Sequence, residues 1–345
     1  MAINSSFFSS KELSVGVGID ATNVGTVASS YTYIEAESVT PPTFNDIKIE
    51  RRGGAGSGIM TATTDMFHWG KGATIEGSVS GLMTDALVPL LMSNVLGTAV
   101  SSNSWTVDGT STSNVTFEHG DSSPLSNKTL TFAYNGVGSS TDDCVAVPGC
   151  VITSLTLSAD PNEDGGRMKF DASWISRTRI AIGSTYSATV SSGAATYSED
   201  YVYLGDYSYN TKVDNTDVLL KSFAMTIENP VVFGGFGGNA AEGTPQTYIR
   251  SIPEMAITVN PVLKYDANCD QLWEDARGSD DGVQDETLAA PAFEMTSAAS
   301  DANRTISVTD GTVTEVAWDE GDYLGLSVGI KARGDNATSF YFKHA

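Results

Sequence analysis

The order of elements that decides the fold occurs twice in this chain. Residues 44–50 read FNDIKIE, residues 51–58 RRGGAGSG, residues 73–81 ATIEGSVSG and residues 83–97 MTDALVPLLMSNVLG. The order returns over residues 223–278 as FAMTIEN, FGGFGGN, EMAITVNP and DANCDQLWEDARG. Each block reads as a strand, a Gly-rich loop, a second strand and a short helix. A further strand pair around an acidic turn follows each block, LTLSADPNEDGGRMKFDASW at 155–174 and VTEVAWDEGDYLGLSVGIKA at 313–332. A period this long indicates two copies of one domain rather than a solenoid.

The strands show a period of two, which is typical of half-buried antiparallel strands. We therefore predict a mainly β protein with two tandem β-sandwich or open-barrel domains. Each domain carries one short flanking helix and a long inter-strand loop. The small, polar stretch that follows Ile182 sets the predicted boundary, with domain 1 at residues 1–182 and domain 2 at residues 183–345.

The second predicted helix begins at the N-cap Asp266 and ends at Gly278, with Cys269, Leu272 and Trp273 on its apolar face. The first contains Pro89, which lacks the N–H that an interior turn needs. We expect it to start irregularly at Thr84 and to become regular after Pro89.

Charge and hydropathy exclude several classes of protein. The 42 acidic and 19 basic residues give a net charge of −23, and this surface repels nucleic-acid phosphates. No apolar run reaches the length of a membrane span, about 18 residues. The first residues, MAINSSFFSSKELS, lack a basic region followed by an apolar core, so we expect no secretory signal and maturation in the cytoplasm.

Three cysteines do not form an even disulfide framework. Cys144 and Cys150 lie close enough in sequence to pair in an oxidising medium, and the sequence leaves both the thiol and the disulfide state open.

The Gly-rich segments 51–73 and 229–252 are much longer than ordinary hairpin connections. Met60, Met66, Phe67 and Trp69 in the first segment would be poor residues to leave in water. We therefore expect both segments to be binding loops without structure of their own. A mobile surface excursion is the alternative.

Motifs for chemistry are sparse. The three histidines are far apart, and neither a nucleophile elbow nor a phosphate-binding loop occurs. We therefore predict no catalytic residues and no cofactor. Asp160, Asn162, Asp164 and Asp171 match the ligand spacing of a calcium loop, although strands flank them and the last position is not Glu. The alternative for DPNEDGG is an ordinary hairpin turn, and we take the turn as the default.

The stretches ATIEGSVSGLMTDALVPLLMSNVLG, VITSLTLSADPNEDGG and LLKSFAMTIENP resemble the tail tube (major tail) proteins of long-tailed, non-contractile bacteriophages, the siphophages. The resemblance covers most of the chain and lies in pattern rather than in invariant residues. It implies two tandem tail-tube-type domains in a structural virion protein, not an enzyme. Such subunits polymerise as stacked rings into the tube through which DNA is ejected.

The resemblance also implies partners. Six tube domains close a ring in that family, so a chain with two domains would form a trimeric ring with pseudo-sixfold symmetry; a hexamer is the alternative. Other expected partners are the tape measure protein and the tail terminator and tip proteins, while genomic DNA passes without specific binding. The protein would be assembled in the host cytoplasm and would reside in the virion tail. Inter-ring contacts are expected from Arg51, Arg52, Met60, Met66, Phe67, Trp69, Phe233 and Phe236.

The sequence leaves other functions open. The nearer ones are a tail terminator or a capsid decoration protein. A β-sandwich surface or carbohydrate-binding protein is more distant. A secreted adhesin or surface-layer protein would require an export signal, and a carbohydrate-active enzyme would require a cleft with paired carboxylates and exposed aromatic residues.

Overall fold

The computed structural model of the protein describes residues 13–20, 25–50, 66–96, 115–118, 129–135, 144–178, 180–182, 201–235, 247–250, 256–270, 272–273, 288–297, 304–321, 324–333 and 340–344. The fold is mainly β with large antiparallel sheets, as predicted, and contains one α-helix among these residues. No helix in this described part is long and apolar enough to cross a membrane.

The strands of the N-terminal segment are β1 (Ser14–Ile19), β2 (Thr32–Ile34), β3 (Ala36–Glu50), β4 (Met66–Leu82), β5 (Val115–Glu118), β6 (Leu130–Asn135), β7 (Cys144–Ala159), β8 (Lys169–Ser176) and β9 (Ala181–Ile182). Those of the C-terminal segment are β10 (Asn210–Val213), β11 (Thr216–Asp217), β12 (Leu220–Glu228), β13 (Val231–Gly235), β14 (Thr247–Arg250), β15 (Ala256–Lys264), β16 (Phe293–Thr296), β17 (Thr305–Val308), β18 (Gly311–Glu320), β19 (Leu324–Ala332) and β20 (Phe340–His344). Helix α1 spans Leu87–Val95, and the 3₁₀ turns η3 and η4 span Asp164–Gly166 and Leu204–Asp206.

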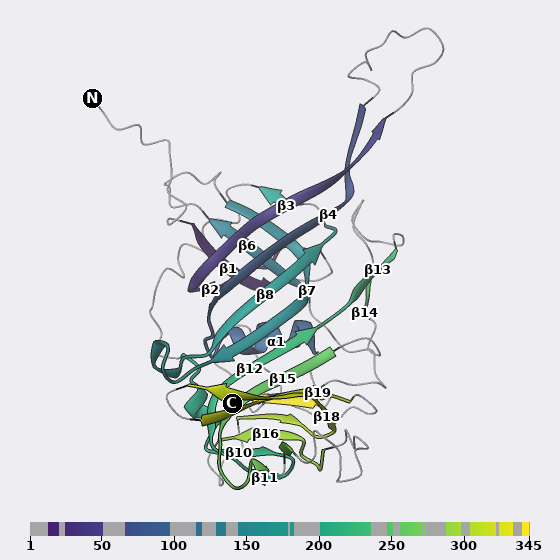
Figure 1. Ribbon diagram of the computed structural model, residues 1–345. Helices are drawn as coiled ribbons and strands as arrows, with labels where there is room; N and C mark the ends of the chain where they lie inside the picture. The colour runs from purple at the N-terminus through teal and green to yellow at the C-terminus, as the bar shows by residue number, and fades with distance from the viewer. Residues whose placement is uncertain are drawn as a thin grey trace, which may run out of the picture.

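Eight strands form a continuous antiparallel sheet in the order β3-β4-β8-β7-β12-β15-β19-β18. Figure 1 shows these strands following one another across the molecule. Its central contact joins β7 to β12, with Phe223 opposite Ala159 and Glu228 opposite Ser154. We call this contact the internal seam.

The order of pairings is the same on both sides of the seam. β3-β4-β8-β7 on one side corresponds strand by strand to β12-β15-β19-β18 on the other. Two pairs of β-bulges, each with one bulge on either side of the seam, fix the correspondence. Glu37 in β3 and Lys221 in β12 are the extra residues of the first pair of bulges, and Thr153 in β7 and Thr314 in β18 are those of the second.

Both pairs of bulges give the same alignment. The bulges in β7 and β18 align Trp174 of β8 with Ile330 of β19. The bulges in β3 and β12, followed through the pairing of β4 with β8 and of β15 with β19, align the same two residues. In this alignment Val39 corresponds to Phe223. Matching the two sequence blocks at Phe44 and Phe223 is therefore a few residues out of register, because the sequence pattern does not reveal where β3 enters the sheet.

The strands outside the eight-stranded sheet form a second layer, which repeats its own pairing order. The first part of β7 pairs with β6 and β9, and β6 continues to β1 and β2, which gives the order β2-β1-β6-β7-β9. A separate sheet repeats this order as β11-β10-β16-β17-β20 and ends with β5. β5, from the N-terminal segment, pairs with β20 at the C-terminus. The segments 1–182 and 183–345 are thus joined through strand pairing in both layers.

Helix α1 packs within the core and contacts β7. An irregular turn starts at Thr84, as expected, and the Thr84 carbonyl accepts the N–H groups of Leu87 and Val88. The helix is already regular from Leu87, so the expectation that it becomes regular only after Pro89 is wrong. Pro89 occupies the first turn, where N–H groups have no intrahelical acceptor. In the second predicted helix, Asp270, Leu272 and Trp273 are helical, and the carboxylate of Asp266 accepts the backbone N–H of Asn268 at 2.9 Å. Residues 274–278 lie outside the described residues.

The Gly-rich segments are not free of secondary structure. β3 continues to Glu50 and β4 resumes at Met66, so strand pairing takes up part of the first segment, and this hairpin projects from the body (Figure 1). In the second segment, β13 and β14 form their own hairpin. The expectation of structureless loops over 51–73 and 229–252 is wrong at these strands, because glycine weakens a strand but does not prevent cross-strand hydrogen bonds.

Core positions that correspond between the two four-stranded units are filled by different pairs of residues, and the combined size of each pair is similar. Gly77 of β4 lies opposite Trp174 of β8, and Val259 of β15 lies opposite Ile330 of β19. A Cβ atom at Gly77 would lie 2.4 Å from Trp174 Cζ2, so the indole occupies the space of the missing side chain. The same backbone therefore accepts either a Gly–Trp or a Val–Ile pair.

We expect Gly77→Val to destabilise the protein by about 1–3 kcal/mol, because its side chain collides with Trp174 in a close-packed core. Adding Trp174→Ile recreates the pair found at Val259 and Ile330. The double variant should be more stable than the sum of the two single effects by at least about 0.5 kcal/mol in urea unfolding. Purely additive effects would contradict this complementarity.

Candidate functional site: a polar sheet face and two outer edges

The eight-stranded sheet has one apolar and one polar face. Leu157, Phe223, Val259 and Leu326 are among the buried residues of the apolar face. The polar face carries mainly small hydroxyl-bearing side chains, together with glycine, asparagine and scattered charges. Its members include Ser78, Ser80, Ser154, Thr156, Ser158, Ser173, Ser222, Thr226, Thr258, Asn260 and Ser327, with the acids Glu76, Asp171 and Glu228 and the bases Lys169, Lys264 and Lys331.

The internal seam is sealed on both faces. On the apolar side Leu157 lies opposite Met225, and both side chains are fully buried. On the polar side the hydroxyls of Thr156 and Thr226 are 3.1 Å apart and share a hydrogen bond. A cross-strand pair of this kind adds a fraction of a kcal/mol.

Two buried asparagines complete the seam where the bulge interrupts the ladder of β7. Asn229 donates its backbone N–H to the carbonyl of Thr153 and its side-chain N–H to that of Ile152, both at 2.8 Å. From α1, Asn94 accepts the N–H of Ile152 at 2.7 Å and donates to the carbonyl of Cys150 at 3.3 Å. These bonds satisfy backbone groups that would be costly to bury unpaired.

The sheet ends in two outer edges, β3 and β18. Within the described residues, β3 pairs only with β4 and β18 only with β19. An edge strand presents backbone N–H and C=O groups that can pair with another chain. In β3, Pro41 and Pro42 together face Gly77 in a further bulge, a position that suits proline.

The edge strand β18 carries a half-exposed aromatic residue. Trp318 lies opposite Leu326 and therefore on the apolar face, yet 47% of it is exposed. Its ring centroid lies 4.8 Å from that of Tyr265 and 5.0 Å from that of Trp273. Among the described residues, the apolar face is thus only partly covered at this edge.

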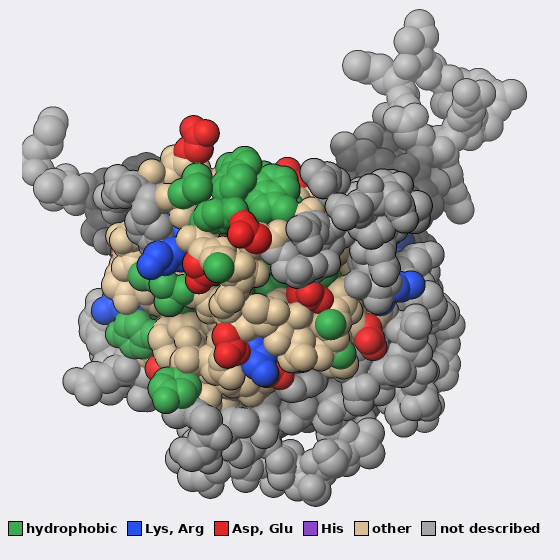
Figure 2. Space-filling model, turned by 60° about the horizontal axis from the view of Figure 1, so that its bottom comes forward, with side chains coloured by type: hydrophobic (Ala, Val, Ile, Leu, Met, Phe, Trp, Pro, Cys, Tyr) green, Lys and Arg blue, Asp and Glu red, His purple; other side chains and the backbone are tan. Residues whose placement is uncertain are grey.

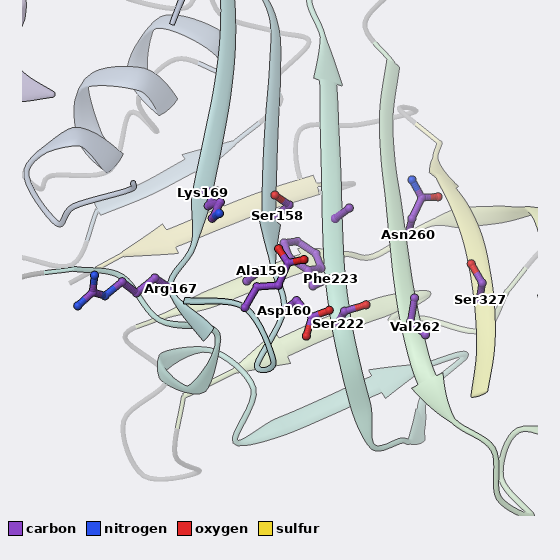
Figure 3. A pocket seen from close by; sticks show the side chains of 12 residues that line it. Ser158, Ala159, Asp160, Arg167, Lys169, Ser222, Phe223, Asn260, Val262 and Ser327 are labelled. Carbon is purple, nitrogen blue, oxygen red and sulfur yellow. The ribbon is translucent and has the colours of Figure 1, made fainter. Parts of the chain in front are cut away.

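A pocket opens on the polar face at the internal seam (Figure 3). Its lining comes from five strands and the turn after β7, and includes Ser158, Asp160, Lys169, Ser222, Asn260 and Ser327. Figure 3 shows these side chains spread along the strands rather than converging on one point. A catalytic centre requires reactive groups that converge, so this pocket does not single out a nucleophile or a base.

The residues of the candidate calcium loop have other neighbours. Asp160 accepts the backbone N–H of Asn162 at 2.8 Å, and Asp164 lies 2.5 Å from Lys169, whose hydrogen bond and then charge lower the pKa of that carboxyl. Asp171 is on the polar face of β8. No group of three His, Cys, Asp or Glu side chains in the described ranges is arranged to hold a metal ion.

The predicted inter-ring residues are described only in part. Met66, Phe67 and Trp69 lie in β4 opposite Glu50, Ile49 and Ile47, and Phe233 lies in β13 opposite Tyr248. For these residues only the backbone is described. Arg51, Arg52, Met60 and Phe236 lie outside the described residues.

Cys150 is a free, buried thiol, and burial raises its pKa. Cys144 lies in the same strand, opposite Asn135, whereas Cys150 lies opposite Leu130, so the two are five residues or about 16 Å apart along β6 at 3.3 Å per residue. A disulfide needs Cα atoms within about 7 Å, so this strand excludes the pairing that the sequence left open.

A partly buried polar cluster ties α1 to the C-terminal sheet, with Tyr207 and His344 buried and the charged side chains partly exposed. Arg304 lies 3.0 Å from Asp206 and 3.3 Å from Asp85, the latter just before α1. The Nδ1 atom of His344 lies 2.8 Å from the Tyr207 hydroxyl, and its Nε2 atom 3.4 Å from Asp85. Burial, and then Arg304, lower the pKa of His344 to about 3, so the Asp85 contact is that of a neutral imidazole rather than an ion pair.

The rest of the surface is mixed. On the face shown in Figure 2, acidic, basic and hydrophobic side chains are interspersed, and hydrophobic ones gather toward the top of the view.

Sequence reasoning missed the residues that distinguish the two outer edges. Pro41 and Pro42 interrupt an otherwise extended stretch, which is a signal for an edge or a bulge. Trp318 continues the alternation of Val316, but alternation does not tell an edge strand from a central one.

No protein-family model matches this chain, and no curated protein matches it.

The pKa of His344 predicts a loss of stability on mild acidification. The unfolded histidine takes up a proton near pH 6.5, whereas the folded one stays neutral to about pH 3, so the free energy of unfolding falls as the pH drops through this window. Between pH 6.5 and 5 the loss should approach about 2 kcal/mol. His344→Gln should flatten this part of the profile in urea titrations at several pH values. Equal slopes for both proteins would contradict a buried, neutral His344.

Proposed function

We propose that this chain is the tail tube protein of a long-tailed, non-contractile bacteriophage, a structural protein that forms stacked rings around a channel for DNA. In this proposal residues 1–182 and 183–345 are tandem tube domains. The observation that carries it is the internal seam, which joins two four-stranded units of the same pairing order.

The seam supports self-assembly through a simple geometric argument. β7 and β12 meet at the seam, and the outer edges β18 and β3 are their counterparts in the repeated order. If a second copy places its β3 against β18, the relation within the chain is repeated between chains. A contact of this head-to-tail kind closes a ring or extends a filament, depending on the rotation per unit.

The size of the ring comes from the resemblance to tail tube proteins. Six domains per ring correspond to three chains with pseudo-sixfold symmetry, and six chains are the alternative. Continuous strand pairing around the ring would leave no open sheet edge, which removes the hazard of uncontrolled edge-to-edge association.

The polar face is suited to line the channel. Hydroxyl groups and glycines offer few charges to a passing phosphate backbone, and the chain as a whole carries a net charge of −23. Lysine and arginine would bind DNA by releasing counterions, so a wall with few of them lets DNA slide. The lysines of this face are interspersed with acids: Lys169 lies 3.2 Å from Glu37 and 2.5 Å from Asp164, and Lys221 lies 2.5 Å from Asp319.

The projecting β3–β4 hairpin is suited to reach a neighbouring ring (Figure 1). Met66, Phe67 and Trp69 lie in this arm and would bury apolar surface on stacking. The remaining proposed partners, the tape measure, tail terminator and tip proteins, follow from the resemblance alone.

Electron microscopy of the purified protein tests the function. We expect long hollow tubes built of rings with threefold and approximate sixfold symmetry. Isolated rings that never stack would instead favour a tail terminator, and a permanently monomeric protein would contradict the proposal.

The electrostatic role of the polar face makes a second prediction. Glu76, Asp171 and Glu228 are exposed on this face. Replacing all three by lysine should leave tubes intact but slow DNA release from phage particles, because the wall would then attract phosphate. The matched control replaces the same acids by Gln, Asn and Gln, which removes charge without reversing it. Wild-type release rates in the lysine variant would contradict a channel lined by this face.

A further inference from the structure

The correspondence between the seam and the outer edges extends to single residues. The shared bulge in β7 and β18 places Trp318 at the position of Leu157 and Ala317 at that of Thr156. Matching β3 to β12 in the same way places Thr43 at the position of Thr226. The internal seam is thus a template for the contact between copies.

The outer edge is exposed where the internal seam is buried. Leu157 is fully buried against β12, whereas its counterpart Trp318 is 47% exposed. Met168, just before β8, is fully buried, whereas its counterpart Leu324, at the start of β19, is 47% exposed. Large apolar side chains left in water at one place mark an interaction site.

The opposite edge differs at the matching place. Met225 faces Leu157 across the seam and Val259 within its own unit. The counterpart of Val259 is Gly77, and two residues of β3, Pro41 and Pro42, face it together. Met225 therefore has two counterparts in β3. The Leu–Met contact of the seam therefore corresponds to a contact between Trp318 and the Pro–Pro bulge.

We propose that β18 of one copy pairs antiparallel with β3 of the next, with Ala317 opposite Thr43, and that Trp318 packs on Pro41 and Pro42 as the contact that selects this edge. The inference rests on the proposed self-assembly and goes beyond it, since it fixes the strands, their register and the residue that determines specificity.

β18 selects β3 rather than a second β18 because the two edges differ chemically. Proline has no N–H to donate, so the bulge weakens pairing of β3 with an arbitrary strand. An indole can cover the apolar proline rings and exclude water from them, which compensates for the missing bonds. A second β18 edge offers no such bulge, so two copies join head to tail rather than through identical edges.

Cysteine cross-linking tests the register. Residues directly opposite each other in an antiparallel pair have Cα atoms about 4.5–5.5 Å apart, which suits a disulfide. The double variant Ala317→Cys with Thr43→Cys should yield covalent species of three linked chains on a non-reducing gel after mild oxidation. The control pairs Ala317→Cys with Ser38→Cys, on the same face but more than ~10 Å along β3. Equal or better linking of the control, or no linking of the first pair, would overturn the register.

Substitution of Trp318 tests the specificity contact. Trp318→Lys should abolish assembly while leaving the circular dichroism spectrum of the free chain unchanged. Trp318→Leu should retain assembly, because leucine fills the same position in the seam. Assembly of the lysine variant at wild-type concentration, or equal failure of both variants, would overturn the role of Trp318.

The two proposals can fail separately. Cross-linked rings or open ladders without tubes would keep the register and refute the tail tube function. Tubes without the link between residues 43 and 317 would keep the function and refute the register.

Discussion

The pairing of β7 with β12 is the interaction on which the rest of the structure depends. β7 is long enough to belong to two layers, since its first part pairs with β6 and β9 and its second part with β8 and β12. Through it the apolar faces of both units form one continuous core. Loss of this pairing would expose Leu157 and Met225 together and leave the backbone around the bulge without its asparagine partners, so the two units stabilise each other.

The repeated pairing order constrains what the core can accept. Gly77 with Trp174 and Val259 with Ile330 fill corresponding space with different side chains, because packing density rather than residue identity must be conserved at such positions. The same reasoning explains why the bulge positions agree while the sequences diverge. A bulge sets the bend and twist of a strand, so moving it would change the register of every pair beyond it.

Part of the candidate site could be predicted from the sequence. The alternation at residues 73–81 and 223–229 identified the strands and the two chemically distinct faces, because side-chain direction in a strand has a local period of two. It did not identify the seam, because the pairing of β7 with β12 joins segments that lie far apart in the chain. The edge residues Pro41 and Trp318 were missed for the same reason, since being an edge is a property of the assembled sheet.

The sequence by itself determined the β class, the duplicated order of elements and the excess of acidic residues, all of which can be read from local pattern and composition. Only the tertiary structure decided that the two units share one sheet, that Cys144 and Cys150 lie too far apart to bond, and that β3 and β18 form the outer edges. The physical reason is that strand pairing is selected by the burial of apolar faces from distant segments, as where Leu157 meets Met225, and no local pattern encodes which distant face will be available.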